Sequence, residues 1–212
     1  LDKMGYGGVV KDPGHVTQQS NDGGIDGIIK EDILGLGRIH IQAKRYKREN
    51  SIGREDVQKF VGALAVAQSN KGLTHIIFEY QIPQFEFIIN KKYPGKKILR
   101  DDKALSSTVE QLNEYFSGNR RSFTINLDLA MPPFYQKVLM TVKKIPYGKT
   151  ISYQEVAKRA GRPKAVRAAG SANAKNPLPI VIPCHRVLAT GGRLGGYGGG
   201  LKIKNYLLNL EG

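Results

Sequence analysis

The sequence predicts an α+β protein, in which a small mixed α/β lobe at the N-terminal side precedes a mostly helical C-terminal domain. Two observations support this prediction. Short segments with strand character are concentrated before residue 130, and helical patterns dominate after it. In the C-terminal half, two short helices joined by a glycine-containing turn have helix-turn-helix spacing, although any small helical hairpin has the same composition.

The N-terminal half gives four predictions, in chain order. Residues 37–46 alternate polar and apolar side chains, which predicts a strand. Residues 53–68 carry an apolar stripe at helical spacing, which predicts a helix with one buried face. Residues 73–80 predict a short strand. Residues 81–103, with prolines, a glycine and several lysines, predict a loop that contains one strand at 85–90.

The middle of the chain gives a helix, a strand and a second helix. Residues 105–118 predict a helix that Gly118 closes. Residues 122–129 alternate in the manner of a strand. Residues 132–145 begin with two prolines and continue with apolar residues at helical spacing, which predicts a helix.

The helix-turn-helix candidate covers residues 151–176. Its first helix, 151–161, contains Ser152 and Glu155 at the spacing of a capping box. Its second helix, 162–176, is basic and rich in alanine. Small side chains on such a helix let its backbone approach a groove closely.

Positive charge is concentrated in the C-terminal part of the chain. The formal net charge of the 212 residues is +15. Residues 131–212 hold 14 Lys and Arg and two acidic residues, whereas residues 1–70 are nearly balanced. This predicts a nucleic acid as partner, because contacts with phosphates release counterions; a well-solvated surface is the alternative. No apolar run reaches the ~18 residues that span a bilayer, so no membrane partner is expected.

The single cysteine, Cys184, lies in the segment Pro-Ile-Val-Ile-Pro-Cys-His-Arg-Val, residues 179–187. One cysteine excludes an internal disulfide and a cysteine-only zinc site, and it favours a reducing, cytoplasmic location. A free cysteine is usually a small buried hydrophobe. Here, however, His185 can take the thiol proton and lower the pKa of the thiol from ~8.5. Adjacent strand residues point to opposite faces, so direct contact needs a turn or a bridging water.

The residues around Cys184 add to this interpretation. Prolines at 177, 179 and 183 stiffen the approach to the sulfur. The glycine-rich segment 191–200 follows, and its one aromatic residue, Tyr197, is suited to stacking on a flat ligand; a flexible linker is the alternative. Glu211 could orient His185 as in a catalytic triad, although a glutamate near a terminus is usually exposed.

Residues 179–187, together with 164–179 and 195–212, resemble the O6-alkylguanine-DNA alkyltransferases, also called methylated-DNA–protein-cysteine methyltransferases. The Pro-Cys-His-Arg core is highly specific for this family, and the similarity runs from about Lys71 to Gly212. The resemblance implies a winged helix-turn-helix-like C-terminal domain. It also implies a single irreversible transfer of an alkyl group from guanine O6 in double-stranded DNA to the cysteine. A monomer without cofactor or structural zinc is expected.

The resemblance assigns roles in the chemistry to four residues. Cys184 would accept the alkyl group, and His185 would deprotonate it through a water. Glu211 would orient His185, and Asn176 would brace the active-site turn.

The resemblance also implies base flipping and minor-groove binding. Tyr153 would help to expel the guanine and to rotate the nucleotide out of the stack, and Arg167 would fill the space that it leaves. The residues expected to contact the substrate base are Tyr153, Tyr197, Gly198 and Val187. The residues expected to contact DNA are Ser152, Lys164, Ala165, Arg167, Ala168 and Lys175.

Residues 1–70 resemble a different family, the catalytic domain of Mrr-type restriction endonucleases. There an aspartate and a Gln-x-Lys pair hold Mg²⁺ and polarise the scissile phosphate, and Asp26, Gln42 and Lys44 match them. Otherwise Asp26 is a turn residue between glycines, and Lys44 is a solvated strand end. The module is incomplete, because alkyltransferase sequence replaces the strands after its central helix. We therefore expect this segment to substitute for the first hairpin of an alkyltransferase rather than to hold a metal.

These resemblances predict three parts: a partial Mrr-like segment at 1–70, an alkyltransferase N-terminal α/β region at 71–128, and a DNA-binding and active-site domain at 129–212. Three functions stay open. The chain could be a suicide repair alkyltransferase, a Mg²⁺-dependent nuclease that uses Asp26, Gln42 and Lys44, or a non-catalytic helix-turn-helix lesion binder. A thiol beside a histidine favours the first, because a binder needs neither.

Overall fold

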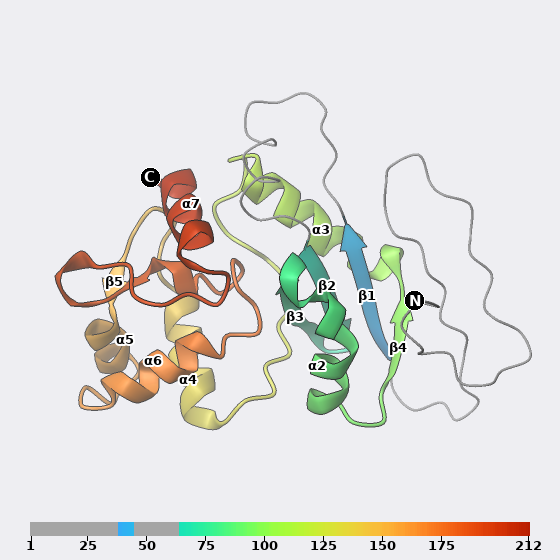
Figure 1. Ribbon diagram of the computed structural model, residues 1–212, viewed down its shortest axis with the longest axis horizontal. Coiled ribbons are helices and arrows are strands. Elements are labelled where there is room, and N and C mark those ends of the chain that lie inside the picture. The colour runs from blue at the N-terminus through green and yellow to red at the C-terminus, as the bar shows by residue number, and fades with distance from the viewer. Residues whose placement is uncertain (1–37, 45–63) are drawn as a thin grey trace, which may run out of the picture.

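The computed structural model describes residues 38–44, as a backbone trace, and residues 64–212. Figure 1 shows a sheet with its helices beside a second part made of α4 to α7. The elements in chain order are β1 (Arg38–Lys44), β2 (Leu64–Ser69), β3 (Gly72–Phe78), the 3₁₀ helix η2 (Glu79–Gln84), α2 (Phe85–Lys92), β4 (Lys97–Arg100), α3 (Asp102–Phe116), α4 (Pro133–Lys143), β5 (Ile151–Ser152), α5 (Tyr153–Arg159), α6 (Val166–Ala174), the 3₁₀ turn η3 (Cys184–Arg186), β6 (Val187–Leu188), η4 (Thr190–Gly192) and α7 (Leu201–Glu211). The predicted α+β class is confirmed. Among the described helices, none has the length and apolarity needed to cross a membrane.

The four-stranded sheet has the order β3-β2-β1-β4. Strand β2 pairs antiparallel with β3 and with β1, and β4 pairs parallel with β1. Strand β1 therefore has a hydrogen-bonded partner on each side. The segment before residue 70 supplies a central strand of this sheet, because Ile41 is in register with Ala67 on one side and Arg100 on the other.

The two faces of the sheet are covered by different layers. On one face, Leu64, Val66, Ile76 and Phe78 belong to a large core that also includes α3 and the helices of the second part. On the other face, Ala65, Ala67 and Ile77 pack against two residues of α2, Phe85 and Ile89. Because side chains alternate along a strand, both faces of β2 are buried over residues 64–67, and these four residues are all apolar.

Two predictions for this lobe are wrong. Residues 64–68, predicted as the end of a helix, form β2, and the rest of that predicted helix lies outside the described residues. Residues 85–90, predicted as a strand, lie in α2. A short apolar run fits either state, and the choice is made by partners: β2 has strands on both sides, whereas α2 buries Phe85 and Ile89, which are four residues apart.

The predicted strand at 122–129 is reduced to a single bridge between Leu73 and Leu127. The nitrogen of Leu73 donates to the carbonyl of Asn126, and the nitrogen of Asp128 donates to the carbonyl of Leu73. Gly72 permits this close approach. Its φ is +148°, and a Cβ there would lie 2.4 Å from the carbonyl oxygen of Asn126. The segment thus ties the two parts of the molecule together without extending the sheet.

The helix-turn-helix prediction corresponds to α5 and α6, which pack on α4. Ser152 caps α5, because its Oγ accepts a hydrogen bond from the nitrogen of Glu155 at 3.1 Å. Gly161, with φ +80°, makes the turn after α5. Helix α6 begins later than predicted, at Val166, and β5 pairs parallel with β6 beside the unit.

Candidate active site

Cys184 lies at the first position of the tight turn η3, after the buried segment 178–183. Asn176 holds this segment, because its Nδ2 donates to the carbonyl of Ile182 at 2.8 Å and its Oδ1 accepts from the nitrogen of Leu178 at 3.0 Å. Asn173 of α6 donates to the carbonyl of Cys184 at 3.3 Å. All three residues of the turn, 184–186, are buried, and the turn directs both His185 and Arg186 to Glu211, whereas successive residues of a continuing strand would point to opposite faces.

The side chain of Cys184 is 5% exposed and lines two cavities. One, of about 380 Å³, lies toward the helix-turn-helix unit and is lined by Tyr153, Gly170, Tyr197 and Gly198. The other, of about 240 Å³, lies toward β3, η2 and α2. The sulfur is therefore buried, but it adjoins a cavity whose volume is sufficient for a planar ring.

The sequence-based expectation that His185 lowers the pKa of Cys184 is wrong for this conformation. Burial raises the pKa of the Cys184 thiol to about 11, although a hydrogen bond from Asn176 and the charge of Lys204 act in the opposite direction. His185 points toward Glu211 rather than toward the sulfur. The thiol is consequently protonated at neutral pH, and forming the nucleophile requires a base.

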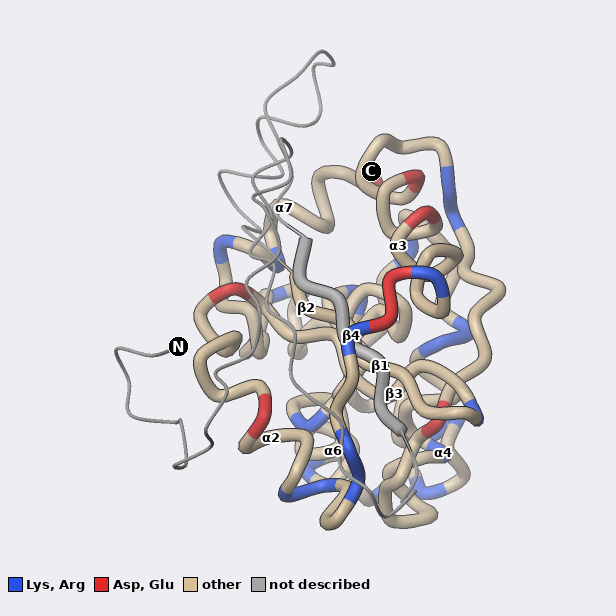
Figure 2. Tube along the Cα trace, turned by 90° about the vertical axis from the view of Figure 1, so that its right-hand side faces the viewer, with Lys and Arg blue, Asp and Glu red and all other residues tan. Residues whose placement is uncertain are grey.

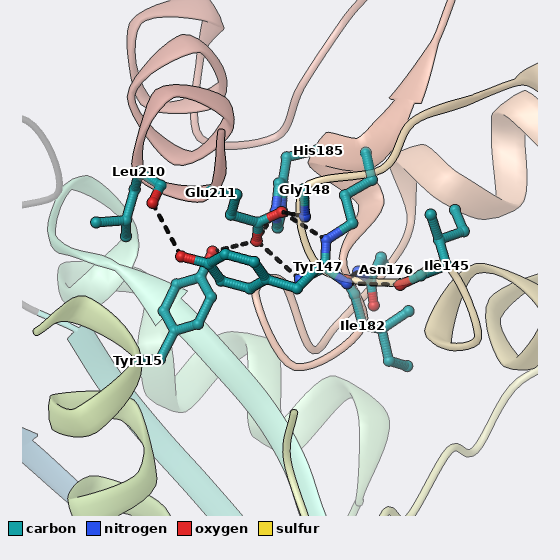
Figure 3. Close-up of polar contacts among 10 residues, drawn as sticks. Tyr115, Ile145, Tyr147, Gly148, Asn176, Ile182, His185, Leu210 and Glu211 are labelled. Atoms are coloured by element: carbon teal, nitrogen blue, oxygen red, sulfur yellow. Dashed lines mark hydrogen bonds and ion pairs between the residues drawn. The ribbon is translucent and has the colours of Figure 1, made fainter. Parts of the chain in front are cut away.

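His185 is fully buried and bonded to the C-terminal helix (Figure 3). Its Nε2 lies 2.9 Å from Oε1 of Glu211. Its Nδ1 has no hydrogen-bond partner among the described residues. Burial lowers the pKa of His185, and the Glu211 carboxylate opposes this effect. The ring is thus held as a neutral imidazole, with a proton on Nε2 and a free lone pair on Nδ1.

Glu211 is buried rather than exposed as a terminal glutamate usually is. Arg186 donates from Nε to Oε2 at 2.7 Å and from Nη2 to Oε1 at 2.8 Å. The hydroxyl of Tyr115 donates to Oε1 at 2.6 Å, and the nitrogen of Gly148 donates to Oε2 at 3.3 Å. Burial disfavours the charge, but the hydrogen bonds from His185 and Arg186 prevail and lower the pKa of Glu211 to about 2. The carboxylate is therefore ionised at neutral pH.

The residues expected to contact the substrate guanine are only partly brought together. Tyr153, the first residue of α5, lines the larger cavity with Tyr197 and Gly198. The buried hydroxyl of Tyr197 has no hydrogen-bond partner among the described residues, and its ring meets that of His185 edge-on at 6.5 Å. Val187 is fully buried and is not among the residues that line the two cavities.

The residues expected to contact DNA lie on or beside α5 and α6. Lys164, Arg167 and Lys175 are exposed; Arg167 lies within α6, whereas Lys164 precedes the helix and Lys175 follows it. Ser152, Ala165 and Ala168 are half-buried. In Figure 2, blue segments gather near α4 and α6. Of the two acidic residues in 131–212, Glu155 is paired with Arg159 and Glu211 is buried, so this surface is strongly basic.

The residues proposed for a nuclease are not assembled into a described site. Gln42 and Lys44 lie two apart on β1, and Asp26 lies outside the described residues. Among the described side chains, no group of three or more His, Cys, Asp and Glu could hold a metal ion.

Comparisons with known proteins follow the same division of the chain. The model of the 6-O-methylguanine DNA methyltransferase DNA-binding domain matches residues 133–212, and that of the ribonuclease-like domain of the same proteins matches 57–129. A methylated-DNA–protein-cysteine methyltransferase of Methanosarcina barkeri is 38% identical over 160 residues, which are 73% of this chain and 94% of the relative. The chain belongs to the methylated-DNA–protein-cysteine methyltransferase family.

Other members of this family agree. The enzyme of Mycobacterium tuberculosis is 49% identical over 111 residues, which cover 52% of this chain and 67% of the relative. The crystal structure of Mycobacterium tuberculosis OGT in complex with DNA matches with a TM-score of 0.62 and 34% identity, over 82% of this chain and 92% of that one. A restriction endonuclease model also matches, over residues 1–79, so it overlaps the methyltransferase match in β2 and β3.

Three buried polar residues near Cys184 and Glu211 were not predicted from the sequence to belong to the site. Arg186 belongs to the Pro-Cys-His-Arg motif, but the motif does not predict its hydrogen bonds to Glu211 and to the carbonyl of Ile145. Lys204 is 0% exposed and donates to the carbonyls of Val187 and Leu194; its position on the apolar stripe of α7 signalled its burial. Tyr115 lies on the apolar stripe of α3, which predicts burial but not its partner.

Proposed function

We propose that this protein repairs DNA by transferring an alkyl group from O6 of guanine to Cys184, once and irreversibly. The supporting observation is the position of the sulfur. It lies at the wall shared by two cavities, with a neutral, oriented imidazole in the next residue. A protein that only bound lesions would need neither the thiol nor the imidazole.

In the proposed reaction, the Sγ of Cys184 attacks the alkyl carbon in line with its bond to O6. The S–C bond forms as the C–O6 bond breaks, and the electron pair of the broken bond passes to the guanine. Because burial raises the pKa of the thiol to about 11, the proton must leave as the attack proceeds. Nδ1 of His185 takes it through a water, and Glu211 stabilises the imidazolium from the other side.

The leaving guanine needs a proton, and Tyr153 would provide it. Its ring lines the cavity that Cys184 also lines. Burial raises the pKa of Tyr153, so the hydroxyl is protonated at neutral pH. Tyr197 and Gly198 wall the same cavity and would hold the base, whereas Val187 would support them from the core. Asn176 would fix the position of the sulfur, because its two hydrogen bonds hold the backbone of the segment that precedes Cys184.

The DNA partner is proposed to be a duplex that carries O6-alkylguanine, bound through its minor groove and with the damaged nucleotide flipped out. Lys164, Arg167 and Lys175 present positive charge from the helix-turn-helix unit. The small residues Ala165 and Ala168, with Ser152, allow close approach of the backbone, and Arg167 would enter the vacated stack. The protein is proposed to act as a monomer, because the residues assigned to the chemistry all belong to one domain, residues 129–212.

The proposed division of the chain keeps the three parts 1–70, 71–128 and 129–212, with the chemistry in the last. Strand β1 of the first part is a central strand of the sheet on which the second part is built. We therefore assign to residues 1–70 the completion of the alkyltransferase fold. The displacement needs no cofactor, because the thiol supplies the electron pair, and it needs a reduced thiol, which supports a cytoplasmic location.

The nuclease alternative starts from the match of residues 1–79 to a restriction endonuclease model. The names of the curated relatives do not favour it. Activity through Asp26, Gln42 and Lys44 would require Mg²⁺. Cleavage of duplex DNA that depends on Mg²⁺ and is lost in Lys44→Ala would establish it as a second activity.

The test of the proposed function is a mass measurement on the intact protein. After incubation with duplex DNA that contains O6-methylguanine, each molecule should gain one CH₂ unit, and the modified peptide should contain Cys184. The Cys184→Ser variant should bind the duplex and gain nothing. An unchanged mass of the folded wild-type protein would defeat the proposal.

A further inference from the structure

The carboxylate of Glu211 receives hydrogen bonds from four residues in three separate segments of the chain. His185 and Arg186 come from η3, Gly148 from the loop after α4, and Tyr115 from α3. Tyr115 differs from the others because it belongs to the lobe that carries the sheet. It is 0% exposed and lies 96 residues before Glu211 in the chain.

The direction of this hydrogen bond is fixed by the charges. Glu211 is ionised, so it can only accept. Burial, reinforced by the nearby Glu211, raises the pKa of Tyr115 well above its usual value. The phenol therefore keeps its proton and donates it, at the short distance of 2.6 Å. Its ring is held in place by edge contacts with Phe116 and Tyr147, at 5.4 and 6.2 Å between centroids.

Tyr115 and His185 use the same oxygen. Both lie within hydrogen-bond distance of Oε1, at 2.6 and 2.9 Å (Figure 3). A carboxylate oxygen that accepts a strong bond from one donor offers less negative charge to the next. The hydroxyl of Tyr115 thus fixes where Oε1 lies and also weakens its pull on the proton of His185.

We propose that Tyr115 is a positioning residue for the alkyl transfer, through which the N-terminal lobe sets how strongly Glu211 acts on His185. The inference rests on the proposed function, in which His185 is the base. It predicts that without this hydroxyl His185 becomes easier to protonate. As pH falls, His185 should then stop acting as a base at a higher pH than in the wild-type protein.

Other charged and titratable groups also face His185. Glu211 and Lys204 lie on α7, Arg186 on η3, and Tyr197 on the glycine-rich segment. Arg186 and Lys204 lower the pKa of His185, whereas Glu211 raises it. Replacing tyrosine by phenylalanine at 115 leaves all of these in place and removes one oxygen atom. The variant Tyr115→Phe therefore isolates the hydroxyl with the least change in packing.

The experiment compares the rate of methyl transfer at saturating lesion DNA from pH 5 to 9 in the full chain. In the wild-type protein, the rate should rise with pH as His185 loses its proton. In Tyr115→Phe, this acidic limb should move to higher pH by about half a unit or more, because the carboxylate stabilises the imidazolium more strongly. The affinity for undamaged duplex should stay within about twofold, since Tyr115 is buried far in sequence from the basic helices.

The matched control is Tyr147→Phe. The hydroxyl of Tyr147 donates to the backbone carbonyl of Leu210 at 2.9 Å, next to Glu211 but not to its carboxylate. This variant also loses one half-buried phenol oxygen beside α7, so a purely structural effect should appear in both variants. The pH profile of Tyr147→Phe should coincide with that of the wild-type protein.

A second readout keeps the inference separate from the proposed function. The imidazole of His185 can be titrated by NMR in the resting protein, with and without the Tyr115 hydroxyl. An upward shift of its midpoint in Tyr115→Phe supports the inference, even in a protein that transfers nothing. An unchanged or lower midpoint overturns it, and a wild-type protein that transfers nothing defeats the proposed function alone.

Discussion

The C-terminal domain and the N-terminal lobe differ in how their structure is specified. In residues 129–212 the site combines one short motif, Cys184 to Arg186, with Glu211 of the C-terminal helix, 25 and 26 residues after Arg186 and His185. In the lobe, a central strand comes from a segment that matches a different family, and its partners are 20 to 60 residues away. Yet the lobe reaches the site, through Tyr115 at Glu211 and Tyr80 at Gly198. The comparison teaches that the groups of the proposed chemistry all lie in one domain, whereas their positioning also depends on the other part of the chain.

The largest effect is expected from Glu211→Gln in the C-terminal domain. Removing one partner of a buried ion pair leaves Arg186 uncompensated, which should cost about 3 kcal/mol of unfolding free energy at pH 7. Because the folded pKa of about 2 lies below the ordinary 4.5, the stabilisation is present above pH 4.5 and is lost as pH falls toward 2. Urea titrations at pH 7 and pH 3 should show a steep loss in the wild-type protein and a flatter one in the variant.

The control for this prediction is Glu155→Gln, which removes an exposed carboxylate paired with Arg159. Its stability should change little and should keep the pH dependence of the wild-type protein. A similar loss of unfolding free energy in both variants would mean that burial of the Glu211 carboxylate does not increase its contribution to stability.

A proline in the N-terminal lobe should have the next largest effect. Ile41→Pro removes a ladder hydrogen bond from the central strand β1 and should cost about 3 kcal/mol. Because Tyr115 and Tyr80 depend on this lobe, alkyl transfer should fall as well. Thermal unfolding and methyl transfer would be measured beside Ile41→Val, which keeps the strand. Full transfer by Ile41→Pro would show that the C-terminal domain works without the lobe.

A smaller effect is expected on DNA binding from Arg167→Ala. The exposed guanidinium on α6 should contribute one phosphate or stacking contact, so the slope of log affinity against log salt should fall by about 1. Fluorescence anisotropy at several salt concentrations measures this slope. Lys202→Ala, on the exposed face of α7, is the control and should leave the slope unchanged. Equal slopes in all three proteins would remove Arg167 from the interface.

The smallest effect is expected from Tyr80→Phe. The hydroxyl of Tyr80, on η2, donates to the carbonyl of Gly198 beside the larger cavity. Its loss should loosen segment 195–200 by about 1 kcal/mol, visible as faster amide exchange there. Tyr135→Phe removes a hydroxyl that bonds Ser171 at 2.9 Å and should leave that segment unchanged. Unaltered exchange in Tyr80→Phe would limit the influence of the lobe to Tyr115.

The sequence-based predictions of secondary structure succeed for helices that carry their own signals and fail for short segments of the N-terminal lobe. Helices α3 and α4 were predicted because each carries its own apolar stripe, and α5 because Ser152 caps it. Residues 64–68 were predicted as helix but form a strand, and residues 85–90 were predicted as a strand but form a helix. A short apolar run fits either structure, and its sequence does not indicate which segments will pack against it. At the site, the motif indicated Cys184 and His185, but the sign of the pKa shift of the thiol depended on burial, which no motif contains.

The sequence by itself indicated the candidate thiol, the histidine beside it and the basic helices, because each of these signals is contained in one short segment. Only the tertiary structure decided that Glu211 is buried and ionised, that Tyr115 and Arg186 share it with His185, and that β1 lies inside the sheet. The physical reason is that burial and hydrogen-bond partners are properties of segments brought together from far apart in the chain.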